Sequence, residues 1–479
     1  MNELSHRFRH FVGGAFREGP DAMEVLNPAT EKALGGAPEA DEAMVDEAVR
    51  SAAAAQPAWA HLPAIERAKP LRALAQAIRG DVSRIARIIA AEQGKVLPLA
   101  EMEVFITAEY LDYSAEWARR IEGEVITSDR PGEHMFLFRR PMGVVAGILP
   151  WNFPFFVIAR KMAPALITGN TIVVKPSEET PYSAHAFAEI AAASGLPDGV
   201  FGLVNGRGAT TGRALVRHPG VDMISFTGSS AAGAQIMADA SMNLTKVNLE
   251  LGGKAPAIVL DDATIDLAVG TLKASKALNS GQACNCAERI YVDRRIAAEF
   301  KEKLAAAMGS IKSGDPLGDV PIEMGPLVNK DAVERLQAMV GDAREKGAEV
   351  LTGGSAHERG GGFHFEPTVI AGTSKDMHVS SRELFGPVVL VDEIDGLDEG
   401  IARANDSEYG LTSSVFTNNL NAAMKAINEL KFGETYVNRE NFEAIQGFHA
   451  GVRRSGIGGT DGKHGLYEYT HTQVAYIQT

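Results

Sequence analysis

The only cysteines of the chain lie close together, at Cys284 and Cys286. Small or polar residues, Asn279-Ser280-Gly281-Gln282-Ala283, precede the first thiol and let backbone N–H groups and a small molecule approach it. The run Glu288–Val292 predicts a strand directly afterwards, because it is rich in β-branched and aromatic residues. A thiol on a loop that enters a strand suits a nucleophile, since the strand fixes it and the loop exposes it. The alternative is a buried structural cysteine, a common environment for free thiols.

These thiols also raise the question of a metal site. Zinc sites built on cysteine need further Cys or His ligands at a fixed spacing, and no second cysteine pair is present. A disulfide between positions i and i+2 would be strained. We therefore expect no metal, free thiols and a reducing compartment, the cytoplasm.

Further segments place polar groups where an enzyme uses them. Val247–Lys254 sets a single carboxylate, Glu250, between an apolar strand and two glycines, a position suited to a general base. Pro150-Trp151-Asn152-Phe153-Pro154 holds the Asn152 amide between rigid prolines, as an oxyanion donor requires. Taken singly, a solvated loop acid and a turn asparagine explain these segments equally well.

The segment Thr171–Glu178 places Lys175 and Glu178 just past the end of an expected strand. Ligands of open α/β sheets bind at the carboxyl ends of strands. A carboxylate there can accept hydrogen bonds from ribose hydroxyls and repels a 2′-phosphate, which favours NAD over NADP. The alternative is a surface Lys/Glu pair, which is common.

A phosphate is best accommodated at Phe226-Thr227-Gly228-Ser229-Ser230, where a strand end is followed by glycine and then by hydroxyls at a helix start. Free N–H groups and the helix dipole favour an anion there, although Ser229 as an ordinary N-cap explains the pattern too. The strict G-x-G-x-x-G fingerprint is absent, because the last spacing in Gly206, Gly208 and Gly212 is one residue too long.

The elements that must position these groups alternate between strand and helix. After the expected helices at 41–60, 65–92 and 97–120, strands are expected at 144–149, 171–174, 223–226, 247–249 and 257–260. Helices are expected at 155–166, 184–193, 231–240, 265–278, 296–308 and 330–345. This alternation predicts an α/β protein with two doubly wound parallel-sheet domains. The uncharged stretch between Arg140 and Arg160 has the length of a membrane span, but its prolines split it into a buried strand and a helix.

Composition limits the function classes. The net charge of −14 argues against nucleic acid or an anionic membrane as a partner. The polar start of the chain, Met1–Phe8, does not have the pattern of a signal peptide.

Taken together, these segments resemble the aldehyde dehydrogenase superfamily over essentially the whole chain. The motifs that carry the resemblance are Pro150–Pro154, Lys175-Pro176-Ser177-Glu178, Phe226–Ser229, Glu250-Leu251-Gly252-Gly253-Lys254, Gly281–Cys284 and Glu383-Leu384-Phe385-Gly386-Pro387. Each is weak alone, whereas their order and spacing are specific.

The resemblance implies a role for each group. Cys284 is the implied nucleophile and Glu250 the base for thioester hydrolysis, while Asn152 and the Cys284 N–H form the oxyanion hole. Lys175 and Glu178 hold the adenosine ribose, Ser229 the pyrophosphate and Glu383 the nicotinamide ribose, with Phe385 beside it. The implied NAD-binding set is Leu149, Trp151, Lys175, Glu178, Gly228, Ser229, Glu383 and Phe385.

The segments Phe155–Lys161, Asn285–Arg289, Tyr436–Gly451 and Ser455–Gly459 resemble the bacterial branch of the family that oxidises short 2-hydroxyaldehydes, such as lactaldehyde and glycolaldehyde. The implied substrate pocket contains Arg160, Asn285, Glu443 and His449. Without the resemblance, His449 fits a core or turn histidine and Glu443 a solvated loop acid. Gly451-Val452-Arg453-Arg454 departs slightly from this branch.

The family pattern also implies the domain organisation and the partners. Residues 1–121 and 140–252 form an NAD-binding domain, 253–450 a catalytic domain, and 122–139 with 451–479 a small β oligomerisation element. This element implies a homo-oligomer, a dimer or a tetramer.

Two other functions are compatible with the same fold. A coenzyme A-acylating aldehyde dehydrogenase tends to lack the base at Glu250, because coenzyme A rather than water resolves the thioester. A non-catalytic protein that keeps the fold is disfavoured by the presence of Cys284, Glu250 and Asn152 together.

Overall fold

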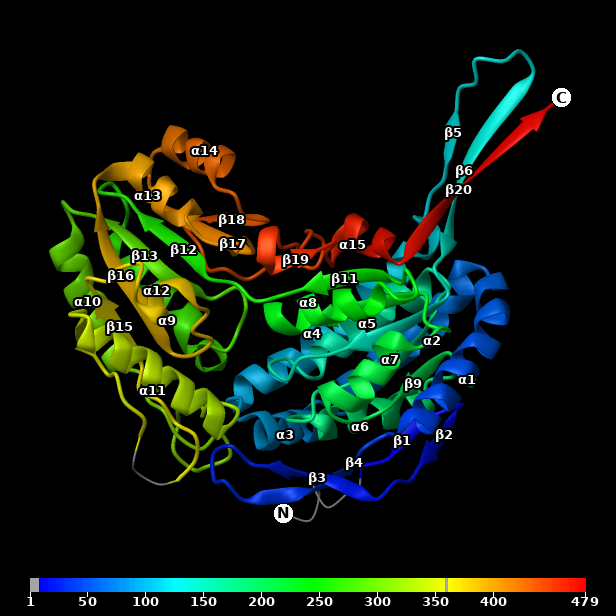
Figure 1. Ribbon diagram of the computed structural model, residues 1–479, viewed down its shortest axis with the longest axis horizontal. Coiled ribbons are helices and arrows are strands. Elements are labelled where there is room, and N and C mark those ends of the chain that lie inside the picture. Colours follow the sequence, from blue (N-terminus) through cyan, green and yellow to red (C-terminus); the bar gives the residue numbers. More distant parts are fainter. Residues whose placement is uncertain (1–7, 358–360) are drawn as a thin grey trace.

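The computed structural model describes residues 8–357 and 361–479 (Figure 1). Most of the polar start, Met1–Arg7, therefore lies outside the described residues. Two sheets with helices on their faces form the body, and a narrow three-stranded arm projects from it. This confirms the predicted α/β class with parallel-sheet domains.

The larger sheet has eight strands in the order β19-β11-β10-β7-β8-β9-β1-β2. Its centre, from β11 to β9, is parallel, and β19, β1 and β2 join it in antiparallel fashion. The bounds are β1 (His10–Val12), β2 (Ala15–Arg17), β7 (Val144–Ile148), β8 (Thr171–Lys175), β9 (Phe201–Leu203), β10 (Met223–Thr227), β11 (Lys246–Glu250) and β19 (Gly456–Ile457).

Alternate residues of these central strands pack into different cores. Val145 and Ile172 belong to a core formed with α2 to α6, whereas Val144 and Val173 belong to one formed with α1, α7 and α8. Because successive side chains of a strand point to opposite faces, the continuous apolar runs reflect burial on both sides. The helices are α1 (Glu42–His61), α2 (Ala64–Arg79), α3 (Val82–Gln93), α4 (Leu97–Glu116), α5 (Phe156–Ile167), α6 (Pro181–Ala192), α7 (Arg213–Arg217) and α8 (Ser230–Ala240).

The second sheet has seven strands in the order β14-β15-β16-β13-β12-β17-β18, parallel except for β14. Its strands are β12 (Ala255–Val259), β13 (Ala287–Asp293), β14 (Glu349–Thr352), β15 (Thr368–Ala371), β16 (Val388–Ile394), β17 (Thr412–Phe416) and β18 (Glu434–Val437). The accompanying helices are α9 (Ile265–Ala277), α10 (Ala297–Gly309), α11 (Lys330–Glu345), α12 (His378–Ser381), α13 (Gly396–Asn405), α14 (Leu420–Glu429) and α15 (Gly462–Glu468), the last of which precedes the arm.

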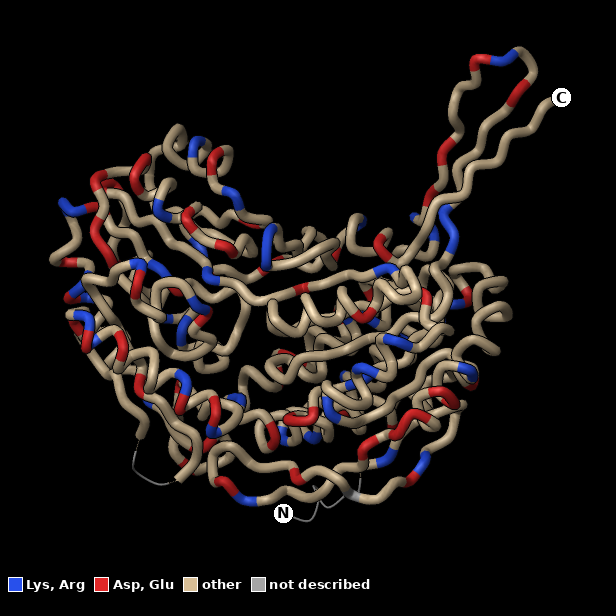
Figure 2. The backbone as a smooth tube through the Cα atoms, viewed as in Figure 1, with Lys and Arg blue, Asp and Glu red and all other residues tan. Residues whose placement is uncertain are grey.

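The arm consists of β20 (Thr470–Gln478), β6 (Glu133–Pro141) and β5 (Glu124–Ile126), with β20 paired to β6 along its whole length. A separate hairpin, β3 (Asp21–Leu26) and β4 (Ala33–Pro38), lies along the opposite edge of the body (Figure 1). Acidic and basic residues are interleaved along both sheet units (Figure 2).

One predicted helix was wrong. The continuous helix expected over 65–92 is two helices, α2 and α3, separated at Gly80 and Asp81. Asp81 has φ −127° and ψ 20°, which is outside the helical region, and the Gly80 N–H closes the last turn of α2 on Ala77 O and Gln76 O. The apolar spacing continues through the break because both helices bury one face in the same core.

The uncharged stretch between Arg140 and Arg160 forms the end of β6, then β7 and the start of α5. Among the described residues, no helix has the length and apolar character needed to cross a bilayer.

The buried Arg67 connects α5 to the helices outside it. Its Nε donates to Ile167 O at 3.1 Å, and its Nη1 donates to Ala60 O at 3.1 Å and to Leu62 O. One guanidinium thus pairs carbonyls at the ends of α1 and α5 that have no other helical partner.

We therefore expect Arg67→Met to lower the free energy of unfolding by about 2–4 kcal/mol, because buried carbonyls lose their donors. The change would be measured by urea denaturation. Arg72→Met, the same substitution at an exposed position of α2, is the control and should stay within about 0.5 kcal/mol of the parent. Equal midpoints for both variants would contradict this role of Arg67.

Candidate functional site

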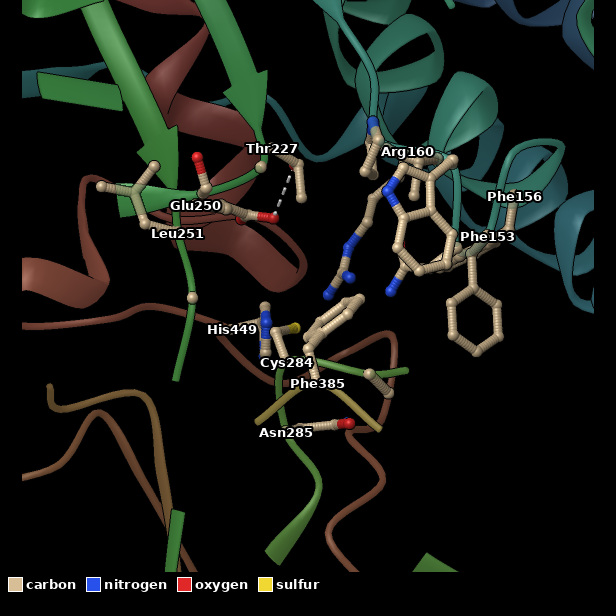
Figure 3. A pocket seen from close by; sticks show the side chains of 18 of the residues that line it. Phe153, Phe156, Arg160, Thr227, Glu250, Leu251, Cys284, Asn285, Phe385 and His449 are labelled. Carbon is tan, nitrogen blue, oxygen red and sulfur yellow. Dashed lines mark hydrogen bonds between the residues drawn. The ribbon is translucent and has the colours of Figure 1, made fainter. Parts of the chain in front are cut away.

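A pocket of about 370 Å³ brings the carboxyl ends of β7, β10 and β11 to face the Cys284 loop. Figure 3 shows Cys284, Glu250, Arg160 and His449 around this space, although they come from segments far apart in the sequence. Of the sequence-predicted residues, the lining contains Trp151, Asn152, Arg160, Gly228, Ser229, Glu250, Cys284, Asn285, Glu383, Phe385, Glu443 and His449.

The loop before the thiol has an unusual backbone. Asn279, Ser280 and Gly281 have φ values of 47°, 60° and 69°, so consecutive residues adopt the left-handed region. A Cβ at Gly281 would lie 2.2 Å from Gly386 O, which only glycine avoids. Ser280 Oγ donates to Gly325 O at 2.8 Å, and the Gln282 side chain accepts the Val328 N–H at 2.9 Å. Tertiary contacts thus hold a conformation that the chain would otherwise avoid.

The structure separates the thiols. Cys284 is partly exposed and lines the pocket. Cys286 is buried, its Sγ contacts Ser275 O at 2.9 Å, and burial raises its pKa to about 11. The structural interpretation therefore fits Cys286, and the reactive interpretation fits Cys284. Gly253 lets two segments meet here, because a Cβ would lie 2.4 Å from Cys284 O.

Asn152 is held from both sides. Its Nδ2 donates to Gln282 O at 3.0 Å, and its backbone carbonyl accepts from Lys95 Nζ at 2.8 Å and Asn279 Nδ2 at 3.1 Å. A primary amide has two N–H donors, so the second remains for an acceptor in the pocket.

Glu250 lies at the end of β11 and is only 4% exposed. Its Oε2 accepts from Thr227 Oγ1 at 3.5 Å (Figure 3), and its Oε1 has no hydrogen-bond partner among the described residues. A desolvated carboxylate on a residue that lines the pocket, with one oxygen unpaired, is suited to accept a proton from a bound molecule.

The part of the pocket around Arg160 is strongly polar. Arg160, on α5, makes a two-point contact with Asp461 and an ion pair with Glu443 at 3.1 Å. Asn285 Nδ2 donates to the other Glu443 oxygen at 2.9 Å. Burial alone would raise the pKa of Glu443, but His449 and Arg160 lower it to about 2. Glu443 is therefore an anchored carboxylate and not a solvated loop acid.

Sequence reasoning missed Asp461, which fixes Arg160. The available signal was an arginine within the otherwise apolar start of α5, which requires a carboxylate partner when buried. Nothing in the sequence identifies which acid supplies it, because Arg160 and Asp461 are 301 residues apart.

His449 is 1% exposed, and its backbone pairs with Thr460 in both directions. Its Nδ1 lies 3.1 Å from Glu434 Oε1. It is therefore a buried histidine with a satisfied partner, and it also lines the pocket.

The predicted cofactor residues form two groups. At the pocket, the Ser229 hydroxyl caps α8 by accepting the Ala232 N–H at 3.2 Å. Ser229 is therefore an ordinary N-cap, and it also lines the pocket. Glu383 Oε1 accepts the Gly253 N–H at 2.7 Å, and burial raises the pKa of Glu383 to about 7. The rings of Trp151 and Phe385 meet edge to face at 5.4 Å.

The second group lies beyond the pocket, at the carboxyl end of β8. Lys175 Nζ donates to Gly206 O at 2.6 Å and contacts Glu178 Oε2 at 3.3 Å. Glu178 Oε1 accepts the Gly208 N–H at 3.1 Å, and its side chain remains 40% exposed. Burial works to raise the pKa of Glu178, but Lys175 and backbone N–H groups, including that of Gly208, lower it. Glu178 is therefore an anion. Leu149 is buried beside Lys175, and the Leu149 N–H donates to Lys175 O.

Another buried carboxylate supports the Glu383 segment. Glu288, on β13, accepts the N–H groups of Leu384 and Phe385 and pairs with Lys254 at 2.9 Å. No group of three or more His, Cys, Asp and Glu side chains that could hold a metal ion occurs in residues 8–357 and 361–479.

Two wound parallel sheets, with a thiol, an amide and a carboxylate in one pocket between them, are the arrangement expected of an oxidoreductase of the aldehyde dehydrogenase class. The chain belongs to the aldehyde dehydrogenase family, whose model matches residues 16–475. Members of this family use a nicotinamide cofactor.

Among its relatives, the chain is 56% identical to the lactaldehyde dehydrogenase of Escherichia coli, over 98% of each chain. A crystal structure of lactaldehyde dehydrogenase from Escherichia coli superposes with a TM-score of 0.97 at 55% identity, over 99% of each chain. A D-glyceraldehyde dehydrogenase (NADP(+)) of Picrophilus torridus is 37% identical, over 98% of this chain and 95% of that protein.

We expect iodoacetamide at pH 8 to alkylate Cys284 and leave Cys286 unmodified, because a buried thiol with a pKa near 11 is almost entirely protonated there. Fragmentation of the tryptic peptide that contains both residues would locate the adduct. Cys286→Ala should keep the label, and Cys284→Ala should lose it. Comparable labelling of both thiols in the native protein would contradict this assignment.

Proposed function

We propose that this protein is an NAD-dependent dehydrogenase that oxidises a short 2-hydroxyaldehyde, such as lactaldehyde or glycolaldehyde, to the carboxylic acid. The observation that supports it is one pocket that combines a thiol, Cys284, with an amide donor and a free carboxylate oxygen, next to a fixed polar cluster. The polar cluster comprises Arg160, Asn285, Glu443 and His449.

In this proposal the Cys284 thiolate attacks the aldehyde carbon and the carbonyl electron pair moves to oxygen. The resulting oxyanion accepts hydrogen bonds from Asn152 Nδ2 and from the Cys284 N–H, which stabilise negative charge where it develops. The nicotinamide cofactor, when bound, supplies the hydride acceptor. Loss of hydride from the thiohemiacetal carbon leaves a thioester on Cys284.

Hydrolysis of this thioester needs a base. Glu250 removes a proton from water with its unpaired Oε1, and the hydroxide attacks the thioester carbon. The carbon–sulfur bond then breaks, its electron pair returns to sulfur and the acid leaves. The presence of Glu250 favours water over coenzyme A as the acceptor of the acyl group.

The substrate class follows from the polar end of the pocket. Lactaldehyde and glycolaldehyde carry a hydroxyl beside the carbonyl carbon, and this hydroxyl can both donate and accept hydrogen bonds. Glu443 is an acceptor fixed by Arg160 and Asn285. Buried polar groups of this kind reject an alkyl aldehyde, because they would lose their partners.

The residues present fit a dinucleotide. The N-terminus of α8, with Ser229, offers N–H groups to a pyrophosphate, and the Lys175/Glu178 pair lies at the carboxyl end of β8 in the same sheet, where an adenosine ribose is expected. The anionic Glu178 would accept ribose hydroxyls and repel a 2′-phosphate. We therefore propose NAD as the cofactor of this chain.

The domain roles are part of the same proposal. Residues 1–121 and 140–252 form the NAD-binding domain, 253–450 the catalytic domain, and 122–139 with 451–479 the oligomerisation element of a cytoplasmic dimer or tetramer. The arm exposes Val125, Tyr476 and Ile477, whose exposed fractions are 78%, 65% and 48%. Exposed apolar side chains on strands at the edges of a sheet suit pairing between copies of the chain.

The proposal is tested by mixing the protein with NAD and measuring NADH formation from limiting lactaldehyde, glycolaldehyde, succinate semialdehyde and a plain alkanal. The hydroxyaldehydes should give the highest kcat/KM. Cys284→Ala should lose at least about a thousandfold in turnover, and Glu250→Gln should give an NADH burst and then a steady state about a hundredfold slower. Product that depends on coenzyme A would instead select the acylating reaction, and no NADH from any aldehyde would refute the dehydrogenase.

Replacement of Glu178 tests the cofactor. Glu178→Ala should raise the ratio of kcat/KM with NADP to that with NAD by about tenfold or more, because it removes a negative charge facing the 2′-phosphate. Glu179→Ala is the matched control, because this neighbouring carboxylate accepts from Asn329 instead. An unchanged ratio in Glu178→Ala would show that cofactor choice resides elsewhere.

A further inference from the structure

The imidazole of His449 lies beside the thiol that is proposed to attack the aldehyde. Both residues line the pocket, and Figure 3 shows the His449 ring next to the Cys284 side chain. Nδ1 of His449 is occupied by Glu434, which leaves Nε2 as the ring nitrogen available to sulfur. One imidazole therefore lies between the Glu434 carboxylate and the Cys284 side chain.

The surroundings of this imidazole are predominantly negative. Glu434 bonds its Nδ1 directly, and Glu443 acts on it through space. The positive group nearby is Arg160, which Asp461 engages at two points and Glu443 at a third. The three carboxylates, on Glu434, Glu443 and Asp461, outnumber the one guanidinium, on Arg160. A positive charge on the His449 imidazole is therefore favoured.

The direction of titration agrees with this geometry. Burial would lower the pKa of His449 and Arg160 lowers it further, yet Glu443, Cys284 and Glu434 together raise it well above its usual value. The backbone pairing of His449 with Thr460 holds the ring in place between its partners.

We propose that His449 is a catalytic residue that holds the proton of Cys284, so that the pair exists as imidazolium and thiolate before the aldehyde binds. This inference rests on the proposed function and adds the group that generates its nucleophile. The proton passes from Sγ to Nε2, the electron pair stays on sulfur, and Glu434 bonds the Nδ1–H of the cation. Cationic neighbours increase the thiolate fraction of a cysteine.

The pairing also leaves Glu250 free for one task. Because His449 takes the thiol proton, Glu250 is needed only for the water that attacks the thioester. When the carbon–sulfur bond breaks, the returning thiolate meets the same imidazolium. The His449 imidazolium thus stabilises the thiolate both when it forms and when it is released. The Glu250 carboxylate acts only in the hydrolysis of the thioester.

The test measures the thiolate itself, without cofactor or aldehyde. Rates of iodoacetamide alkylation would be followed from pH 5 to pH 10 in full-length proteins that all carry Cys286→Ala. His449→Gln should lower the rate at pH 6.5 by about tenfold or more and move the midpoint of the pH profile upward. Glu434→Gln, which keeps the imidazole but removes its charged partner, should move the midpoint in the same direction by a smaller amount.

His464→Gln is the matched control, because His464 is exposed on α15 and does not line the pocket. Its profile should coincide with that of the parent. If His449→Gln fails to fold, Glu434→Gln decides: an unshifted profile overturns the proposal. A raised KM for the hydroxyaldehyde with an unshifted alkylation profile overturns it too, because His449 would then bind substrate only.

Failure of this inference is distinguishable from failure of the proposed function. Alkylation requires neither NAD nor aldehyde, so a protein without dehydrogenase activity can still show the imidazolium–thiolate pair. Conversely, the protein could form NADH from hydroxyaldehydes while its alkylation profile is unchanged by His449→Gln. That result would support the proposed dehydrogenase activity and refute the imidazolium–thiolate pair.

Discussion

The whole site depends on the close approach of backbones around one loop. Gly253 lies against the carbonyl of Cys284, and Gly281 lies against that of Gly386, each at a distance that excludes any Cβ. The residues before the thiol adopt left-handed conformations that cost free energy, and the packing of the surrounding segments compensates for that cost. The thiol therefore takes its position from the way the second sheet packs, and its own side chain contributes little to it.

Buried charges form a second framework around this loop. Lys95 pairs with Glu103 and holds the carbonyl of Asn152, while Lys254 pairs with Glu288, which holds the segment after Glu383. Each pair is fully buried and bonds the backbone next to a pocket residue. Such pairs contribute little net stability, because desolvation opposes their attraction. Their effect here is geometric, since they fix strand-end loops that would otherwise be free to move.

Much of this arrangement could be predicted from the sequence. Apolar runs and turn residues place β7, β8, β10 and β11, and parallel strands bring Asn152, Lys175, Ser229 and Glu250 to one edge of a sheet. The sequence could not show which thiol is exposed, because Cys284 and Cys286 differ only in what other segments place over them. Nor could it identify Asp461 as the partner of Arg160, because 301 residues separate them. Glu434 is only 15 residues from His449, but no periodic pattern in that segment indicates which acid meets the imidazole. The break at Gly80 was missed since the apolar period continues across it.

The glycines at 253 and 281 have a consequence for how related sequences are judged. A related chain can keep the thiol, the amide and the carboxylate and yet have a side chain at either glycine. Such a chain contains the reactive groups but cannot arrange them in this way. A count of relatives that keep the reactive residues would thus overestimate how many of them are active. Substitution at either glycine is a way in which activity can be lost while every reactive residue is retained.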